Sequence, residues 1–583
     1  MVVVLAGIIA SIVWRNAPGS AADADVALGA PGLRTVPSPR AEPLSDEEPV
    51  PGEVAVDPGP GAVHPSVAAP LDDAGFAHVR TVDPSRPVSG TNFHSLSEAV
   101  AALTPQRGVP RDDSKLIRVW EHADGYREGE IAIEVSNLTI ANAPANSPRF
   151  VGTQRLSLAK LDATTWVGHG AEVDAVDAMC FVDRHPASFD QDVFTTVVGQ
   201  TLWHPALDPH QLFVGDTAYT RTLGNLREHH GPAGGTYTVE SPGTVTVALP
   251  QEVDVAPVAE FTTKRFALKV GDYARNVTLI GLSFARYSPC LADTRATLEL
   301  NGPGVSLIDV SVTESAATGI AVSRGTGLLE GAQLIGVDAS NNGASAMTVY
   351  ERGENPIRNG ADEWDPSVDL SGLLVERSRF DGNNTRSFNW TGDGPFGCGD
   401  YCRIAGVKVT RVENSVWRGN SFSDNAAHGL WFDLHSDNAS IVGNVFADNA
   451  GAGLYVEVSR SALIESNSIT GNAGDGSDRS AGALRIGGSR DVVVRGNVFD
   501  KQARSVLIYD DYRDIDPPDW YRSGFGGGAP QVVMEANAYP SANGTDQALV
   551  FVFDHPWYRP VPDATWSTVL PGDGADGRVT YEG

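Results

Sequence analysis

Four copies of a short segment in the later half of the chain constrain its fold more than any other feature. They span residues 419–425, 443–449, 466–472 and 496–500, and each begins with a small residue followed by Asn. That Asn falls at positions 420, 444, 467 and 497, so the spacings are 24, 23 and 30 residues. The apolar runs between the copies are three to six residues long and end at Gly, Asn or Asp. Helical repeats need longer periodic runs without glycine, so the pattern indicates short strands.

Short strands, three to a turn, with Gly and Asn at the corners predict an all-β chain built as a right-handed parallel β-helix. Each coil of such a solenoid buries its inward side chains against the coils above and below. Weaker copies of the pattern occupy residues 276–284, 305–312, 332–338 and 374–380. The predicted β-helix core therefore covers 263–515, and 516–583 is predicted to be a C-terminal cap or tail.

The residues ahead of this core are predicted to hold a cap, the first coils and an insertion. Residues 71–164 contain an amphipathic helical pattern at 95–103, which would cover the otherwise unpaired edge of the first coil. Residues 165–262 break the coil rhythm. Their alternating runs, separated by turn residues, predict antiparallel hairpins in a small inserted β-sandwich.

The first 70 residues predict export. Residues 1–22 carry an apolar run that is short for a membrane span, and we expect a signal peptide or membrane anchor. Residues 23–70 are rich in Ala and Pro without apolar periodicity, so they predict a disordered linker. We expect a monomer that is secreted or associated with the cell envelope, with membrane contact only through that N-terminal anchor.

Composition narrows the set of partners. Among 583 residues, 62 Gly and only 4 Met suit a turn-rich β protein better than a helical one. The formal net charge of −30 disfavours binding to nucleic acid and to anionic lipid. A polyanionic substrate is disfavoured as well, unless a local basic patch overrides the overall field.

Two of the four cysteines suggest a disulfide bond within one loop. In an exported chain, Cys398 and Cys402 are expected to form a disulfide, since no nearby His or Cys completes a metal site. Cys180 and Cys290 could pair with each other or remain buried thiols, and the sequence leaves both alternatives open.

Two Gly-Leu-aromatic-apolar-acid segments occupy the same place in successive repeats. Asp433 and Glu457 each follow the last Asn of the preceding segment, Asn425 or Asn449, by eight residues, so their registers match. Strand alternation directs both acids outward. With adjacent strands about 4.8 Å apart, the carboxyl groups should lie roughly 5 Å apart, the separation of retaining glycosidases. One of the two pKa values should then rise. The alternative is an ordinary solvated outer face.

Other side chains are candidates for substrate binding around this pair. Trp431 and Tyr455 also point outward and would offer stacking surfaces for a sugar ring. The remaining candidates are Lys408, Arg411, His435 and Arg485, each of which could instead be an ordinary surface residue.

No cofactor and no metal are expected. The Asp-Asn pairs at 424/425 and 448/449 fit stacked corner asparagines better than calcium ligands. The acidic residues between Asp510 and Asp516 fit a solvated loop, with a calcium site as the alternative.

These segments resemble a known family. Residues 406–411, 429–433 and 457–459 are similar to motifs of the secreted bacterial right-handed parallel β-helix repeat proteins, which share the solenoid of the pectate lyases, and the resemblance covers about 90–512. The two acid segments resemble those of the β-helix β-xylosidases, which also carry an inserted β-sandwich. The resemblance implies that Asp433 is the nucleophile and Glu457 the acid/base.

The sequence thus predicts an exported, carbohydrate-active protein that acts on an oligo- or polysaccharide as a retaining glycoside hydrolase. A polysaccharide lyase or epimerase is one alternative, and Lys408, Arg411 or Arg485 would then matter most. A non-catalytic envelope or glycan-binding protein is the other.

Overall fold

The computed structural model describes the chain from residue 71 to residue 560 with gaps. The described ranges are 71–169, 210–223, 226–227, 235–240, 243–289, 296–323, 331–350, 372–386, 404–434, 436–474, 482–502, 504–509, 532–539, 550–554 and 559–560. The predicted signal or anchor at 1–22, the linker at 23–70, all four cysteines, His435 and the acidic loop at 510–516 lie outside these ranges.

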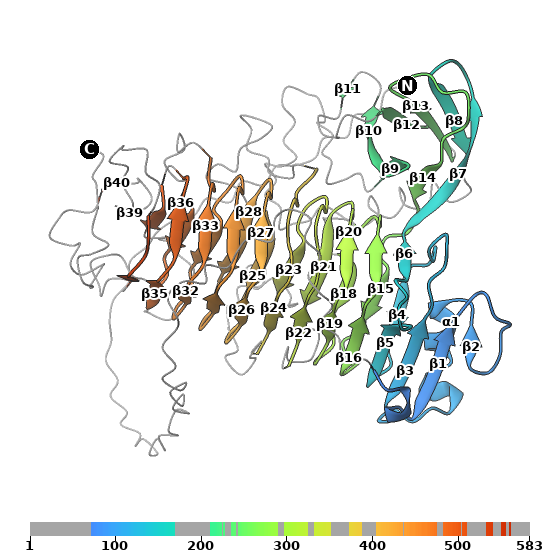
Figure 1. Cartoon of the computed structure of the whole chain (residues 1–583), viewed down its shortest axis with the longest axis horizontal. Helices are drawn as coiled ribbons and strands as arrows, with labels where there is room; N and C mark the ends of the chain where they lie inside the picture. Colours follow the sequence, from blue (N-terminus) through green and yellow to red (C-terminus); the bar gives the residue numbers. More distant parts are fainter. Residues whose placement is uncertain are drawn as a thin grey trace, which may run out of the picture. The chain divides into compact units, whose positions relative to one another are not determined.

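Two long sheets of mainly parallel strands form the body of the described chain (Figure 1). The 13-stranded sheet contains, in order, β2 (Asn92–Phe93), β1 (His78–Val82), β3 (Lys115–Val119), β5 (Leu138–Asn142), β16 (Val277–Ile280), β19 (Ser306–Ile308), β22 (Gln333–Ile335), β24 (Leu374–Glu376), β26 (Val416–Arg418), β29 (Ser440–Val442), β32 (Leu463–Glu465), β35 (Val492–Arg495) and β38 (Val532–Glu535). The 12-stranded sheet contains β4 (Ile131–Ile133), β15 (Leu268–Val270), β18 (Ala296–Leu300), β21 (Thr318–Ser323), β23 (Met347–Tyr350), β25 (Ala405–Thr410), β28 (His428–Asp433), β31 (Leu454–Glu457), β34 (Leu484–Gly487), β37 (Val506–Tyr509), β39 (Val550–Asp554) and β40 (Arg559–Pro560).

A third, narrower face completes each coil. Its strands are β6 (Arg149–Val151), β17 (Ser283–Ala285), β20 (Ser311–Thr313), β27 (Ser421–Ser423), β30 (Val445–Ala447), β33 (Ser468–Thr470) and β36 (Val498–Asp500). Isolated parallel bridges through Asp338 and Arg379 join β20 to β27. Successive coils thus read β26–β27–β28, then β29–β30–β31, which confirms the predicted parallel β-helix. The parallel pairing continues past residue 515, because β38 pairs with β35 and β39 with β37.

Asparagine ladders hold the corners of the coils. One runs through residues 342, 383, 425, 449 and 472, and the other through 420, 444, 467, 497 and 537. In each step the side-chain amide donates to the next Asn, as Asn444 Nδ2 does to Asn467 Oδ1 at 3.0 Å. The same amide also donates to a backbone carbonyl, that of Trp417 for Asn444. These buried amides are therefore satisfied, and the corner interpretation of the Asp-Asn pairs is confirmed.

The interior is a continuous apolar column. Phe380, Phe422 and Phe446 stack with ring centroids 5.2 and 5.0 Å apart on successive coils. All three rings are fully buried, as the repeat pattern requires of inward positions. Each of these three coils thus contributes one ring to a stack that fixes the register of its neighbours.

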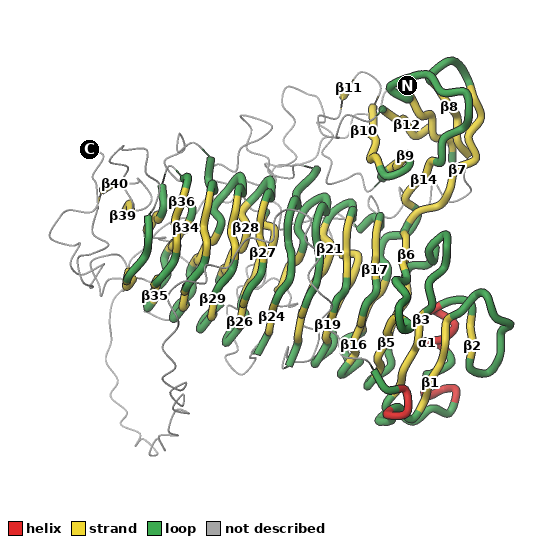
Figure 2. Tube along the Cα trace, viewed as in Figure 1, coloured by secondary structure: helices red, strands yellow, loops and turns green. Residues whose placement is uncertain are grey.

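The predicted cap helix is present beside the first strands. Helix α1 (Leu96–Ala101) has Ser95 as its N-cap, whose side chain accepts from the Glu98 amide, and it buries Leu96 and Val100. Two short 3₁₀ helices, Asp73–Gly75 and Pro105–Arg107, lie nearby in sequence. Figure 2 shows these helical segments in red, beside β1 to β3. No helix among the described ranges is long and apolar enough to cross a membrane.

The inserted module is a separate, mostly antiparallel sheet with its own apolar cluster. Its strands are β7 (Thr153–Lys160), β8 (Thr165–His169), β9 (Leu212–Val214), β10 (Thr217–Leu223), β11 (Leu226–Arg227), β12 (Thr236–Glu240), β13 (Thr244–Ala248) and β14 (Ala259–Thr262). Pairing of β10 with both β9 and β12 closes the sheet on itself around Trp166, Tyr237 and Phe261. The strands of the module extend from Thr153 to Thr262, so β7 lies within the segment 71–164 that the sequence analysis assigned to the cap and first coils.

Candidate active site

The two acids lie on neighbouring strands of the 12-stranded sheet. In the parallel strands β25, β28, β31 and β34, one row of register partners runs across the sheet. It places Lys408 beside Trp431, Trp431 beside Tyr455, and Tyr455 beside Arg485. Two residues further along each strand come Asp433 and Glu457. The alternation that produces this arrangement is simple. The intervening Leu430, Phe432, Leu454 and Val456 belong to the apolar core of the coil, so their neighbours face the other way.

This outward face is buried, which the solvated-surface alternative did not anticipate. Asp433 is 5% and Glu457 7% exposed, and Trp431 and Tyr455 are 6% and 3% exposed. Burying a carboxylate is costly unless it is paired or hydrogen-bonded. The partners of the two acids therefore decide what the site can do.

Asp433 is paired with a lysine from the preceding coil. The Lys408 ammonium lies 3.1 Å from Asp433 Oδ2. The same ammonium lies over the indole of Trp431, 3.4 Å from the ring centroid. Lys408 thus compensates the charge of the carboxylate while resting on an aromatic face.

Glu457 is held by an indole rather than by a cation. Trp431 Nε1 donates to Glu457 Oε2 at 2.9 Å. Because Trp431 belongs to the strand that carries Asp433, this bond draws the second carboxylate back toward the coil of the first. Burial, and then the negative charge of Glu457, raise the pKa of the Tyr455 phenol well above its ordinary value.

The aromatic residues form a column between two cations. Trp431 and Tyr455 are stacked with centroids 5.1 Å apart, and the Arg485 guanidinium lies 4.5 Å from the centroid of Tyr455. With Lys408 on the other side of Trp431, both faces of this ring pair are covered. A sugar could stack on either ring only by displacing a cation, so the proposed stacking role has no free surface in this structure.

Two residues that sequence reasoning missed complete the cluster. Tyr509 lies two strands beyond Glu457, in the ladder position of Gly487, and its hydroxyl hydrogen-bonds to that of Tyr455. Arg485 Nη2 also donates to Tyr509 Oη at 3.3 Å. His428 is buried with its Nδ1 accepting from the Ala452 amide, and its ring meets both Trp431 and Tyr455 edge-on. Tyr509 could have been found by extending the acid register two more coils.

The remaining predicted residues lie at the edge of this cluster or outside the described ranges. Arg411 follows β25 in a left-handed conformation, with φ of 60°, and its amide donates to the Leu434 carbonyl just after Asp433. His435 is not among the described residues. Within those residues, no group of three or more His, Cys, Asp or Glu side chains is arranged to hold a metal ion.

Comparison with known proteins bears on the fold. Residues 296–499, from β18 to β36, match the family model of the right-handed β-helix region. No curated protein matches the chain. Similar solved structures include XylC in complex with xylose, at 11% identity and a TM-score of 0.48, covering 73% of this chain and 77% of that one. The periplasmic alginate epimerase AlgG is similar at 14% identity and a TM-score of 0.31, covering 50% and 62%.

A structure described as a glycoside hydrolase is also similar, at 10% identity and a TM-score of 0.34, covering 86% of this chain and 99% of that one. At these identities and TM-scores, no property of the three structures is transferred to this chain. The three-faced coils give the described chain the fold of a right-handed parallel β-helix, and residues 296–499 of it match the family model of that region.

Proposed function

We propose that this chain is a carbohydrate-active enzyme, a glycoside hydrolase that retains anomeric configuration, with Asp433 and Glu457 as its catalytic pair. The observation that carries the proposal is the placement of two buried carboxylates on adjacent coils of one face. Strands about 4.8 Å apart bring such acids to the roughly 5 Å separation of retaining enzymes. The right-handed β-helix fold is compatible with this activity but does not by itself specify it.

The partners of the two acids suggest a division of roles. Asp433, beside the Lys408 ammonium, has its negative charge compensated and is suited to attack the anomeric carbon as the leaving oxygen departs. Glu457, held by a neutral indole N–H, would donate its proton to that oxygen. It would then remove a proton from the water that cleaves the glycosyl–Asp433 ester and so releases the sugar.

The test is an activity screen on aryl glycosides and on plant and bacterial oligosaccharides, with acid variants. Asp433→Asn and Glu457→Gln are each expected to lower kcat at least about 1,000-fold without unfolding the chain. Azide should rescue Asp433→Ala, giving a glycosyl azide of inverted configuration, because it replaces the missing nucleophile. Glu465→Gln, which removes a half-buried carboxylate paired with Arg495 on the 13-stranded sheet, is the matched control and should retain full activity.

Other outcomes would identify the alternatives. Products that absorb in the ultraviolet through a new double bond would indicate a lyase, and a product of inverted configuration would remove the retaining mechanism. If both acid variants keep wild-type activity toward every cleaved substrate, Asp433 and Glu457 are not the catalytic pair.

A further inference from the structure

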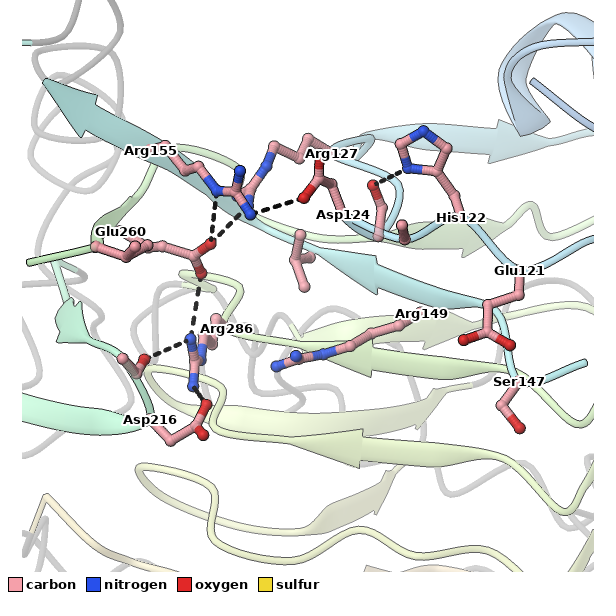
Figure 3. Close-up of a pocket in the computed structure, with 15 residues that line it drawn as sticks. Glu121, His122, Asp124, Arg127, Ser147, Arg149, Arg155, Asp216, Glu260 and Arg286 are labelled. Atoms are coloured by element: carbon pink, nitrogen blue, oxygen red, sulfur yellow. Dashed lines mark hydrogen bonds and ion pairs between the residues drawn. The ribbon is translucent and has the colours of Figure 1, made fainter. Parts of the chain in front are cut away.

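A polar pocket lies where the inserted module meets the first coils (Figure 3). Its volume is about 350 Å³, at the lower end of the usual range for small-molecule sites. The lining comes from residues 121–127 after β3, from β6 and β7, from the β9–β10 turn, from β14 and from Arg286 after β17. Four arginines and four carboxylates are among the lining side chains.

Three of the four arginines are engaged with acids. The Glu260 carboxylate forms ion pairs with Arg127 through Oε1 and with Arg286 through Oε2, the second at 3.2 Å. Arg155 Nε lies 3.8 Å from the same Oε1. Arg286 is further paired with Asp216 and Glu314. The charges of these guanidiniums and acids therefore already compensate one another.

Arg149 is the exception. It projects from β6 into the pocket toward the side where Arg286 and Asp216 lie (Figure 3). Its side chain is exposed, and within the described residues no ion pair or hydrogen bond engages its guanidinium. An arginine with its donors available and a second guanidinium on the facing wall favours an anionic group between them.

We propose that this pocket binds one carboxylate-bearing sugar, a uronate unit of a saccharide, through a bidentate pair with Arg149. Taking a saccharide as the ligand rests on the proposed function, and the carboxylate follows from Arg149. The exposed carboxylate of Glu121 and the hydroxyl of Ser147 line the same pocket and can hydrogen-bond to sugar hydroxyls, whereas the Asp124 carboxylate is paired with Arg155 at 2.8 Å. One available guanidinium among balanced charges suits a single carboxylate. It does not suit a densely charged polyanion, which the net charge of −30 would repel.

The pocket is separate from the acid pair. Along the third face the coils run from β17 to β20, to Asp338, to Arg379 and then to β27, whose coil carries Asp433. Four steps of about 4.8 Å place the two sites roughly 19 Å apart along the solenoid. The pocket therefore anchors a remote unit of a long chain rather than the unit being cleaved.

The test is calorimetric titration with trisaccharides made of two neutral sugars and one uronate unit, which is galacturonate, glucuronate or mannuronate, each compared with its methyl ester. We expect at least one acid trisaccharide to bind the full chain at least tenfold more tightly than its ester. Arg149→Gln should abolish that preference. Val258→Trp, which fills the pocket without changing its charge, should weaken binding as well. Arg495→Gln, an exposed arginine on the 13-stranded sheet, should bind as wild type does.

Titration in an Asp433→Asn background keeps this inference independent of the proposed reaction, because binding is then read without turnover. Loss of activity with retained uronate preference would leave the pocket assignment standing. Equal binding of acids and esters, absence of binding by all three acids, or wild-type behaviour of Arg149→Gln would overturn it. So would binding of a sulfated trisaccharide in preference to every uronate.

Discussion

At the scale of single residues, the candidate site depends on how two carboxylates remain buried. Lys408 compensates Asp433, and the Trp431 indole satisfies Glu457. The eight-residue offset from the corner asparagines predicted that both acids share one face, because strand alternation is strictly local. The identity of their partners was not predictable, since it depends on rotamers chosen by packing across coils.

Another acid, the half-buried Asp381 on the third face, gives the protein a pH-dependent stability. Burial raises its pKa to about 6 against the hydrogen bonds from Ser421 and Ser423. The folded chain therefore holds this proton at pH values where the unfolded chain has released it. Stability should fall as pH rises from about 4 to about 6, by up to about 3 kcal/mol.

The variant Asp381→Asn isolates this effect. Its Oδ1 can still accept from Ser421 and Ser423, since both donate to Oδ1 of the aspartate. In denaturant unfolding between pH 4 and pH 7, the free energy of unfolding of the variant should not show the decrease that residue 381 causes in wild type. At pH 7 the variant should therefore be more stable than wild type. Asp254→Asn, at a fully solvated carboxylate, should keep the wild-type profile. An unchanged pH slope in Asp381→Asn would contradict the assignment.

At the scale of elements, the asparagine ladders and the phenylalanine stack fix how each coil sits on the next. Both were predictable in kind from the recurrence at 420, 444, 467 and 497, because a side chain repeated at one corner must meet its copies. The closed sheet of the insert was only partly predictable. Its pairing of β9 with β10 is local, but its pairing of β9 with β14 joins strands that are distant in sequence.

Removal of one ladder residue should weaken the solenoid locally and measurably. Asn444→Ala leaves the buried Asn420 amide and the Trp417 carbonyl without their partners. At about 1–3 kcal/mol for each orphaned group, the loss should be about 3 kcal/mol in denaturant unfolding. Gln333→Ala, an exposed amide on β22, is the control and should change stability by less than about 0.5 kcal/mol. Equal effects of the two variants would rule out a structural role for the ladder.

At the scale of the whole molecule, one acid joins the insert to the solenoid. Glu260 on β14 pairs with Arg127 from the early coils and with Arg286 after β17. Burial raises the pKa of Glu260, but the hydrogen bond and charge of Arg127, with help from Thr153 and Arg286, outweigh burial and lower the net pKa. The stability that the ionised Glu260 contributes is therefore fully present above the pKa of an unfolded glutamate, about 4.3. It is lost as the pH falls through the lower pKa of the folded state.

Glu260→Gln should therefore destabilise the chain at neutral pH, by about 3 kcal/mol, because Arg286 remains buried with less compensation. The same variant should lose less stability than wild type when the pH is lowered from 5 to 3. Thermal unfolding at the two pH values measures both effects. Identical acid sensitivity in variant and wild type would show that Glu260 does not couple the two modules.

The sequence by itself determined the coil, the corner asparagines and the outward direction of both acids. Each of these follows from periodicity within one or two repeats, where alternation and recurrence leave little freedom. Only the tertiary structure decided that the outward face is buried, that cations cover both aromatic rings, that Tyr509 joins Tyr455, and that Arg149 projects into a pocket between insert and coils. The physical reason is that these contacts join residues separated by segments of irregular length. A local pattern carries no information about which side chains such segments bring together.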